Sequence, residues 1–352
     1  MNNFMVFDAG AHPEIVQDAC TILTEEMKPK ETEEEAGPEK IEPGRLELLR
    51  FSNGNIANKI IDDVRDCDPF LISTQHPPVQ ENVQMTLSVS RNLRKRSEGK
   101  VRVIWLYMPG SRSDKVDQLR ISLGAKDMAD QIVDAGAHGV VIFDPHFPQI
   151  VGFFDSNRTR VEIVTAKSIF LNLIVTEYSH LLNNLAIVSP DLGAAKLAGS
   201  FATRLGPEID LVFVDKRRIG NEEKVRPVAI IGNVKGKDCI VPDDEFCGGG
   251  TFIEVALFLL KNGARSVMGM MTHGVITNLN ALEKIDSIPE ITALHVTNTI
   301  PVPADKRKVS SKLKVHSVAH IVAGVIRCIH ERKSIHGPNG FLRNLYLPEV
   351  RK

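Results

Sequence analysis

The sequence predicts an α/β protein with two similar domains, each built on a mostly parallel sheet flanked by helices. Short apolar runs rich in β-branched residues alternate with longer amphipathic runs, which is typical of parallel strands joined by helices. The chain has 352 residues, which is enough for two domains. Residues 99–110 and 263–274 each hold a glycine, a basic residue, an apolar strand and a turn. Because residue identity between the halves is weak, a coincidental likeness is the alternative.

The first half is expected to open with a strand at 1–6 and a helix at 11–23. Residues 24–44 follow, and they are charged, contain prolines and lack apolar periodicity. We therefore expect a solvated insertion there, with a partner-docking segment as the alternative. The remaining elements are strands at 46–51, 70–74, 101–108 and 139–143, a turn at 52–55, and helices at 79–94 and 126–135.

The second half repeats this succession, and its clearest helix is closed by Gly263 in the position that favours glycine after a helix end. We place the first domain at 1–160 and the second at 161–324. A C-terminal helix at about 325–352 is expected to pack back on the first domain. The strands are expected at 185–189, 211–214, 239–241, 267–271 and 293–296, and the helices at 194–204, 252–262 and 317–331.

The composition argues against several classes of protein. A net charge of −1 gives no general attraction to nucleic acid or anionic membrane, and 5% aromatic residues are few for base stacking. Five scattered cysteines indicate neither a disulfide framework nor a zinc ribbon, and they fit a reducing compartment. No apolar run reaches the length of a membrane span, and we recognise no signal peptide. We therefore expect a cytoplasmic protein.

The stretch 239–252 carries the clearest chemical signal. A short apolar run is followed by two acids, Asp243 and Asp244, then by three glycines and Thr251, and then by a helix. Glycines let backbone N–H groups approach an anion, and a helix N-terminus favours negative charge. The pattern therefore predicts a phosphate site, with an ordinary glycine-rich turn beside two solvated acids as the alternative. The spacing matches neither a Walker loop nor G-x-G-x-x-G.

Three other stretches place polar residues after predicted strands, where α/β sheets bind ligands. His146 follows a strand that ends at Phe143; a core or surface histidine is the alternative to a ligand. Asp191 stands before a helix, where it is either a site residue or a helix cap. The basic run 216–218 follows a strand and opens an irregular stretch to about Pro227, and it is either a functional loop or a solvated one.

Taken together, these stretches resemble the ribose-phosphate pyrophosphokinases, also called PRPP (phosphoribosyl pyrophosphate) synthetases. Residues 239–252 resemble the PRPP loop of type I phosphoribosyltransferase folds, and 140–155 resemble the family signature D-L-H-x-x-Q-I-Q-G-F-F. Residues 187–196 resemble its S-P-D-x-G-G element, and 214–221 its D-K-R-R loop. The turn at 50–55 resembles R-F-S-[DN]-G-E. The motifs occur in the family's order and cover the chain apart from the insertion.

The resemblance implies two type I phosphoribosyltransferase-like domains, with ATP bound by the first and ribose 5-phosphate by the second. The implied reaction moves the pyrophosphoryl group of Mg²⁺-bound ATP to the C1 hydroxyl of ribose 5-phosphate, giving PRPP and AMP. It also implies a homo-oligomer, a hexamer built from dimers, and no nucleic-acid or membrane partner. The resemblance implies that Lys216 and Arg218 act in catalysis and that His146 and Asp191 hold magnesium. It implies that ATP is bound by Phe51, Asn53, Arg112 and His146, of which Phe51 and Asn53 come from a neighbouring subunit. It implies that ribose 5-phosphate is bound by Asp243, Asp244, Gly248, Gly249, Gly250 and Thr251.

Several positions depart from the family pattern. Cys247 replaces an acid, Asn55 replaces a Glu, Ser113 a Gln and Ala194 a Gly, while Pro242 removes a strand N–H. Each lost hydrogen bond to a substrate costs roughly 1–3 kcal/mol. A second hypothesis is therefore a weak or inactive regulatory subunit that assembles with an active paralogue. A true phosphoribosyltransferase is a third, although it would need neither the 140–155 element nor the basic loop.

Overall fold

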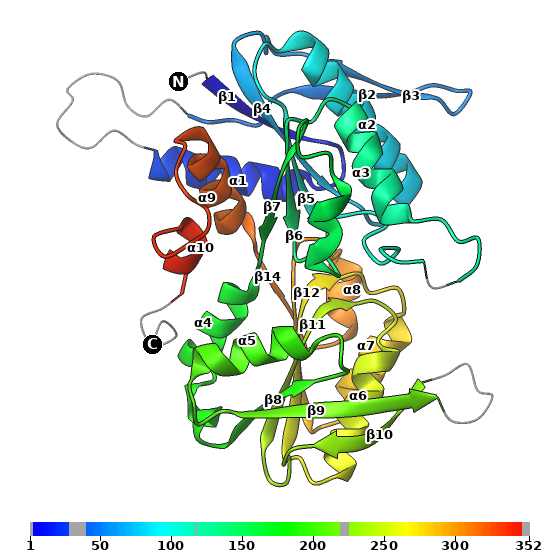
Figure 1. Cartoon of the computed structure of the whole chain (residues 1–352), viewed down its shortest axis with the longest axis vertical. Coiled ribbons are helices and arrows are strands. Elements are labelled where there is room, and N and C mark those ends of the chain that lie inside the picture. Colours follow the sequence, from blue (N-terminus) through cyan, green and yellow to red (C-terminus); the bar gives the residue numbers. More distant parts are fainter. Residues whose placement is uncertain (1–2, 28–39, 117, 219–224, 347–352) are drawn as a thin grey trace, which may run out of the picture. The chain divides into compact units, whose positions relative to one another are not determined.

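The computed structural model describes residues 3–27, 40–116, 118–218 and 225–346 (Figure 1). By its contacts, the chain divides into two compact units. The first is Met1–Thr165 with Ser317–Arg343, and the second is Ala166–His316 with Asn344–Lys352. From sequence alone, we placed these boundaries after residues 160 and 324.

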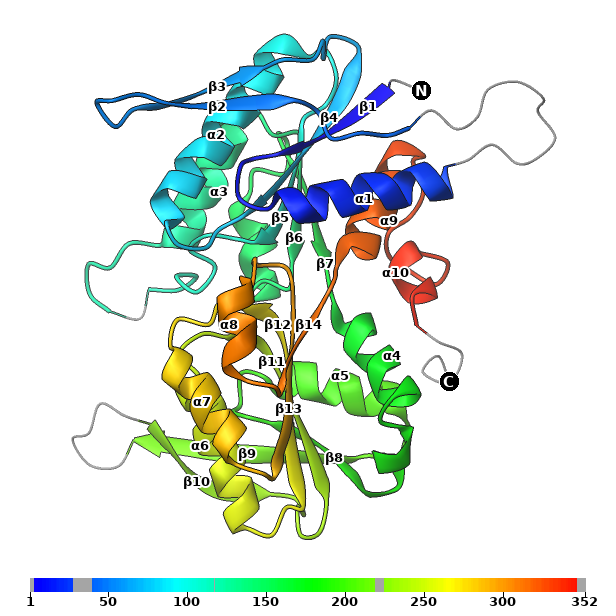
Figure 2. The same cartoon turned by 180° about the vertical axis from the view of Figure 1, so that it is seen from behind.

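The first unit is built on a five-stranded parallel sheet in the order β1-β4-β5-β6-β7. Helices α1 and α9 cover one of its faces, and α2 and α3 cover the other (Figures 1 and 2). Trp105 and the strand residues around it are buried in the core between the sheet and the helices. The bounds are β1 Asn3–Asp8, α1 Pro13–Glu26, β4 Cys67–Thr74, α2 Val79–Arg96, β5 Arg102–Tyr107, α3 Gly124–Asp134, β6 Gly139–Phe143, β7 Arg160–Val164, α9 Ala319–His330 and, at the limit of the unit, α10 Phe341–Asn344.

An antiparallel hairpin accompanies this sheet. Its strands are β2 (Leu46–Arg50) and β3 (Ile56–Ile60). Strand β3 packs on α2, and its Asn58 side chain both donates a hydrogen bond to α2 and accepts one from it. The turn between the strands was expected, but β3 was not. Its sequence, Ile-Ala-Asn-Lys-Ile, offers no continuous apolar run, so its partner strand rather than its own composition makes it a strand.

The second unit has a seven-stranded sheet in the order β10-β9-β8-β11-β12-β13-β14. Only β10 is antiparallel to its neighbour. One core lies between the sheet and α6 and α7, and the other between the sheet and α4 and α5. The bounds are α4 Lys167–Thr176, β8 Leu185–Ser189, α5 Ala195–Leu205, β9 Asp210–Arg218, β10 Val225–Ile231, β11 Asp238–Phe246, α6 Gly250–Lys261, β12 Ser266–Gly274, α7 Leu279–Ser287, β13 Ile291–Thr297, α8 Ala304–Val309 and β14 Leu313–His316.

The two sheets share one topology. The order β8-β11-β12-β13-β14 repeats β1-β4-β5-β6-β7, with all strands parallel in both runs. The prediction of two similar α/β domains is confirmed. The last strand of each run leads into a helix that belongs to the other unit, because α4 follows β7 and α9 follows β14.

Several predicted bounds were wrong. Strand β9 extends to Arg218 and β11 to Phe246, well past the apolar runs that predicted them. Helix α1 runs to Glu26, into the first residues of the expected insertion, whose residues 28–39 lie outside the described chain. After it, the Gly44 N–H donates to the Val6 carbonyl at 2.7 Å, so the end of this segment lies along β1. Elements that the sequence did not predict are β3, β7, β10, β14, α4, α7 and α8. The helix predicted at about 325–352 is not continuous, because α9 ends at His330 and α10 covers only Phe341–Asn344.

Among the described residues, no helix is both long enough and apolar enough to cross a membrane.

Candidate functional site

The glycine loop of the second unit joins β11 to α6. Gly249 has a φ of 77°, and a Cβ there would lie 2.6 Å from the Ala281 Cβ and 2.8 Å from the Phe246 ring. Only glycine fits this position. A Cβ on Gly250 would meet nothing within 4 Å, so open space lies at the N-terminus of α6. No side chain caps this helix, and its first N–H groups are therefore suited to an anion.

A cavity of about 240 Å³ adjoins this loop. The Asn278 carboxamide in its wall accepts a hydrogen bond from the Asn280 N–H at 3.1 Å, which begins α7. The lining combines backbone, amide and amine donors with one carboxylate, which suits a small polar anion that carries hydroxyl groups. The lining residues are Gly248, Gly250, Ile253, Glu254, Asn278, Asn280, Ala281 and Lys284.

The two acids lie inside β11, which corrects the prediction that they follow the strand. The Asp243 carboxylate accepts the Asp244 N–H at 3.0 Å. Burial raises the pKa of Asp243 to about 8, and the neighbouring Asp244 and Asp191 charges act in the same direction. Asp243 is therefore largely protonated at neutral pH until a cation approaches.

Lys216 lies on β9 and Asp191 follows β8, and the local strand order is β9-β8-β11. The Asp191 carboxylate accepts the Ala194 N–H at 3.1 Å. Burial lowers the pKa of Lys216, while the charges of Asp191, Asp243 and Glu254 oppose that shift. The fold therefore brings Asp191, Lys216 and Asp243 into one charged region at the carboxyl ends of adjacent parallel strands.

The sequence predicts that the basic run 216–218 follows a strand. In the structure this run is instead the last part of β9. It pairs with β10, where Pro227 lies opposite Lys216. Charged residues carry no apolar signal, so the pairing with β10 was not visible in the sequence. Residues 219–224, where the sequence predicted the body of the basic loop, lie outside the described residues.

In the first unit, Arg112 and His146 lie in loops that follow the adjacent strands β5 and β6. The two loops meet at Phe147, because the Lys115 ammonium lies 5.8 Å from its ring centroid and the His146 ring 4.6 Å from it.

Phe51 and Asn53 occupy the tip of the β2–β3 hairpin. The Asn53 carboxamide accepts the Asn55 N–H at 3.1 Å, and the Phe51 side chain is 52% exposed. This exposure leaves the ring available to a partner molecule.

Sequence reasoning missed Glu254, Lys284 and the two asparagines of α7. Glu254 was identifiable in principle, because it lies one helical turn after Gly250 on the helix that follows the loop. Lys284 lies on α7 and Asn278 caps its first turn, and the sequence did not predict this helix. At Cys247, the thiol lies 3.8 Å from the Thr277 hydroxyl, so it also contacts the segment that leads to α7.

Comparisons with known proteins agree over both units. Residues 4–136 match the family model of the N-terminal domain of ribose phosphate pyrophosphokinase, and residues 213–337 match the phosphoribosyl synthetase-associated domain. The ribose-phosphate pyrophosphokinase of Clostridium acetobutylicum is 36% identical over 94% of this chain and 95% of its own. That of Wolinella succinogenes is 32% identical over 96% of this chain and 99% of its own.

A solved structure extends the likeness to the fold. The phosphoribosylpyrophosphate synthetase of Mycobacterium smegmatis superposes with a TM-score of 0.81, at 29% identity, over 94% of this chain and 99% of that one. The likeness therefore includes the order and the lengths of both units.

Proposed function

Because the chain belongs to the ribose-phosphate pyrophosphokinase family, we propose that it transfers the pyrophosphoryl group of ATP to the C1 hydroxyl of ribose 5-phosphate. The products are PRPP and AMP, which serve nucleotide biosynthesis. The observation that carries the proposal is the charged region of the second unit. There Lys216, Asp191 and Asp243 lie at the carboxyl ends of neighbouring strands, one of which leads into an uncapped, glycine-rich helix start.

Ribose 5-phosphate binds in the second unit in this proposal. The N–H groups of Gly248, Gly249, Gly250 and Thr251 hold its phosphate, and the open space over Gly250 supports this role. Asp243 and Asp244 accept hydrogen bonds from the ribose hydroxyls. A protonated Asp243 also donates one, as its raised pKa allows at neutral pH.

Lys216 and Arg218 stabilise the transferring phosphates. Phosphoryl transfer depends mainly on positioning and on charge placed where negative charge develops. Lys216 meets this need because its amine lies where the charges of Asp191, Asp243 and Glu254 oppose the lowering of its pKa by burial. Because Lys216 lies on β9, next to the carboxyl end of β8, it is at the same end of the strands as Asp191.

Magnesium fits the acidic residues of the site. Among the described residues, no three His, Cys, Asp or Glu side chains form a metal-binding cluster. Mg²⁺ commonly takes only one or two carboxylates and completes its shell with water and substrate phosphates. We propose Asp191 as a magnesium ligand in the second unit and His146 as one in the first unit. When bound, the ion neutralises phosphate charge, and Asp191 is held for this role by its bond from the Ala194 N–H.

ATP binds to residues of the first unit in this proposal. Arg112 and His146 contact the phosphates from adjacent loops. Phe51 and Asn53 contact adenine, and the exposed hairpin tip suits a contact with nucleotide held by a neighbouring subunit. We therefore propose a homo-oligomer, a hexamer built from dimers.

Cys247 favours a second candidate, a weak or inactive subunit that assembles with an active paralogue. A thiol stands in the loop where the family has an acid, and it faces Thr277 at 3.8 Å. A thiol is a much weaker hydrogen-bond acceptor than a carboxylate, so a ribose contact is weakened there.

One assay separates the two candidates. Purified full-length protein is mixed with ATP, Mg²⁺ and ribose 5-phosphate, and AMP and PRPP are measured. Equal amounts of both products are expected. Product that forms only after an active paralogue is added supports the subunit role, and AMP without PRPP contradicts both.

A further inference from the structure

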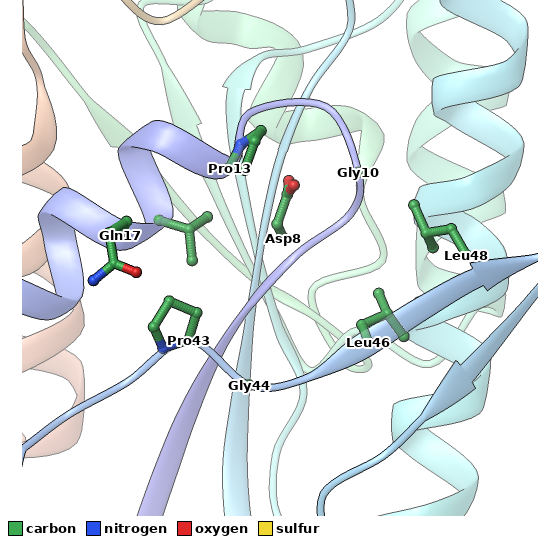
Figure 3. A pocket seen from close by; sticks show the side chains of 9 residues that line it. Asp8, Gly10, Pro13, Gln17, Pro43, Gly44, Leu46 and Leu48 are labelled. Carbon is green, nitrogen blue, oxygen red and sulfur yellow. The ribbon is translucent and has the colours of Figure 1, made fainter.

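A second cavity, of about 280 Å³, lies in the first unit, and none of its lining residues is assigned above to substrate (Figure 3). It opens where β1 turns into α1. The first turns of α1 form one wall, and the start of β2 forms the opposite wall. Figure 3 shows Asp8 at the end of β1, Gln17 on α1, and Leu46 and Leu48 on β2.

Two glycines fix the walls of this cavity. Gly10 has a φ of 90°, and a Cβ there would lie 2.3 Å from Leu48 Cδ1. A Cβ on Gly44 would lie 2.3 Å from the Phe7 ring, and the Gly44 N–H bonds to the Val6 carbonyl. The segment that leads into β2 therefore packs closely against β1 and the turn that follows it. This packing forms the walls of the cavity.

The Asp8 carboxylate is the only acidic group in the lining. Its Oδ1 accepts the N–H groups of Ala11 and His12, each at 3.1 Å. No Lys or Arg among the described residues pairs with it, and His12 is the side chain that acts on it electrostatically. Burial raises the pKa of Asp8 despite these hydrogen bonds. A buried carboxylate that faces a cavity, with no permanently charged cation paired to it among the described residues, marks a candidate binding site.

The lining selects one class of ligand. An anion is disfavoured by Asp8, and a divalent ion lacks the further oxygen ligands it needs. Val16, Leu46 and Leu48 offer apolar surface, and the Gln17 amide offers a second acceptor. Each water in the liquid occupies about 30 Å³, so the cavity holds a molecule of about ten heavy atoms or fewer.

We propose that this cavity binds a primary alkylammonium ion, with the ammonium on Asp8 and the alkyl chain against Val16, Leu46 and Leu48. The bound amine would place a permanent cation beside Asp8, and its methylene groups would leave water for an apolar wall. It would also contact β2, the strand that leads directly to Phe51.

The test uses n-butylammonium as the probe and the full-length protein. Binding is followed by calorimetry and by the NMR chemical shifts of the protein. Saturable binding is expected, with n-butanol, which has the same alkyl chain without the charge, at least about tenfold weaker. Equal affinity for the two probes, or no saturable binding of n-butylammonium, overturns the proposal without any variant.

Two matched variants then locate the site. Asp8→Asn keeps an oxygen acceptor for the Ala11 and His12 N–H groups and removes the charge, so binding should weaken at least about tenfold. Glu14→Gln removes the same charge from an exposed position on the first turn of α1, outside the cavity, and should leave binding unchanged. Equal weakening in both variants would mean general attraction of the cation to an acidic surface. That result, like unchanged binding in a folded Asp8→Asn, rejects the site.

Discussion

Lys216 is the residue whose surroundings depart most from those of an ordinary surface lysine. It is partly buried in a strand, where burial lowers its pKa and the charges of Asp191, Asp243 and Glu254 oppose that shift. A cation in such a place is oriented before substrate arrives, so little reorganisation is needed when phosphate charge develops. Its contribution should therefore appear in the rate of the chemical step.

We expect Lys216→Ala to lower kcat at least about 100-fold while the protein stays folded. The reason is that a charge used in the transition state is lost and the core is left intact. Steady-state kinetics with saturating substrates give the measurement, and circular dichroism checks the fold. Lys235→Ala, an exposed lysine in a turn, is the control and should keep the parent rate. Matching rates in both variants would remove Lys216 from catalysis.

Asp243 should set part of the pH dependence of stability. Its pKa is raised to about 8 in the folded protein, mainly by burial, against about 3.9 when unfolded. Between these values the folded state binds more protons than the unfolded state, so this group makes stability fall as pH rises. Asp243→Asn removes that loss. We expect it to raise the free energy of unfolding at pH 7 by as much as about 4 kcal/mol, which is about 1.36 kcal/mol for each pH unit between 3.9 and 7.

Denaturant unfolding at pH 5, 7 and 8.5 measures the Asp243 effect. The gain of Asp243→Asn over the parent should grow with pH, while binding of ribose 5-phosphate is lost. A gain that is the same at all three pH values would show that Asp243 ionises normally.

At the level of elements, the junction of β11 and α6 depends on two neighbouring glycines for different reasons. Gly249 has a positive φ and close neighbours, whereas Gly250 begins the helix and faces open space. The first position is required by the backbone and the packing. The second is required only by whatever occupies the space above the helix.

We expect Gly249→Ala to destabilise the second unit by about 2 kcal/mol or more, because the new Cβ would meet Ala281 and Phe246 at a positive φ. Gly250→Ala should leave the melting temperature nearly unchanged. It should raise the KM for ribose 5-phosphate several-fold, because its methyl group enters the proposed phosphate space. Thermal melts and kinetics measure both. Normal KM in a folded Gly250→Ala would mean that no substrate lies over this position.

A hydrogen-bonded chain joins three elements of the second unit. The Tyr178 hydroxyl lies 3.1 Å from His295 Nε2, and His295 Nδ1 lies 2.8 Å from His316 Nε2. Burial, followed by the charges of His316 and Lys314, lowers the pKa of His295 to about 3. Burial also lowers the pKa of His316, and Glu177 opposes that shift. The pair is therefore neutral at pH 7.

This chain should make the second unit sensitive to acid. Between pH about 3 and 6.5 the unfolded state binds more protons than the folded one, so stability falls as pH drops through that range. His295→Leu should flatten the dependence of the melting temperature on pH between 4 and 6.5, whatever its effect on stability at pH 7. His180→Gln, at an exposed histidine, should keep the parent slope. An unchanged slope in His295→Leu would assign the acid response to other groups.

At the scale of the whole molecule, the two units share a topology but differ in their loops. Both run through five parallel strands in the same order, and the second adds β9 and β10 at one edge. The connection from β11 to α6 holds Gly248 and Gly249, with Gly250 as the first residue of α6, whereas the equivalent connection from β4 to α2, Gln75–Pro78, holds no glycine. The anion cradle is therefore confined to the second unit, which agrees with the proposed division between ATP and ribose 5-phosphate.

Each unit includes one helix that follows the strands of the other unit in the sequence. Helix α4 completes the second unit although it follows the last strand of the first, and α9 returns to the first unit from the end of the second. Each unit is thus incomplete without a segment from the other part of the sequence. The domain limits could be approached from the sequence, but this exchange rests on contacts between distant segments.

The sequence by itself determined the features that depend on local pattern. The alternation of strands and helices predicted the α/β fold class. The residue types of 239–252 identified the glycine loop, in which position 249 accepts only glycine. The order of motifs indicated the family. These features could be predicted because periodicity, turn chemistry and short motifs are properties of adjacent residues.

Only the tertiary structure decided which residues share the site. Charged strands such as the end of β9 carry no apolar pattern, and they are strands because β10 pairs with them. Asp191, Lys216 and Asp243 come together because β8, β9 and β11 are neighbours in the sheet, and Lys284 joins the glycine loop through α7. Strand order is set by packing between segments far apart in the chain, which no local pattern encodes.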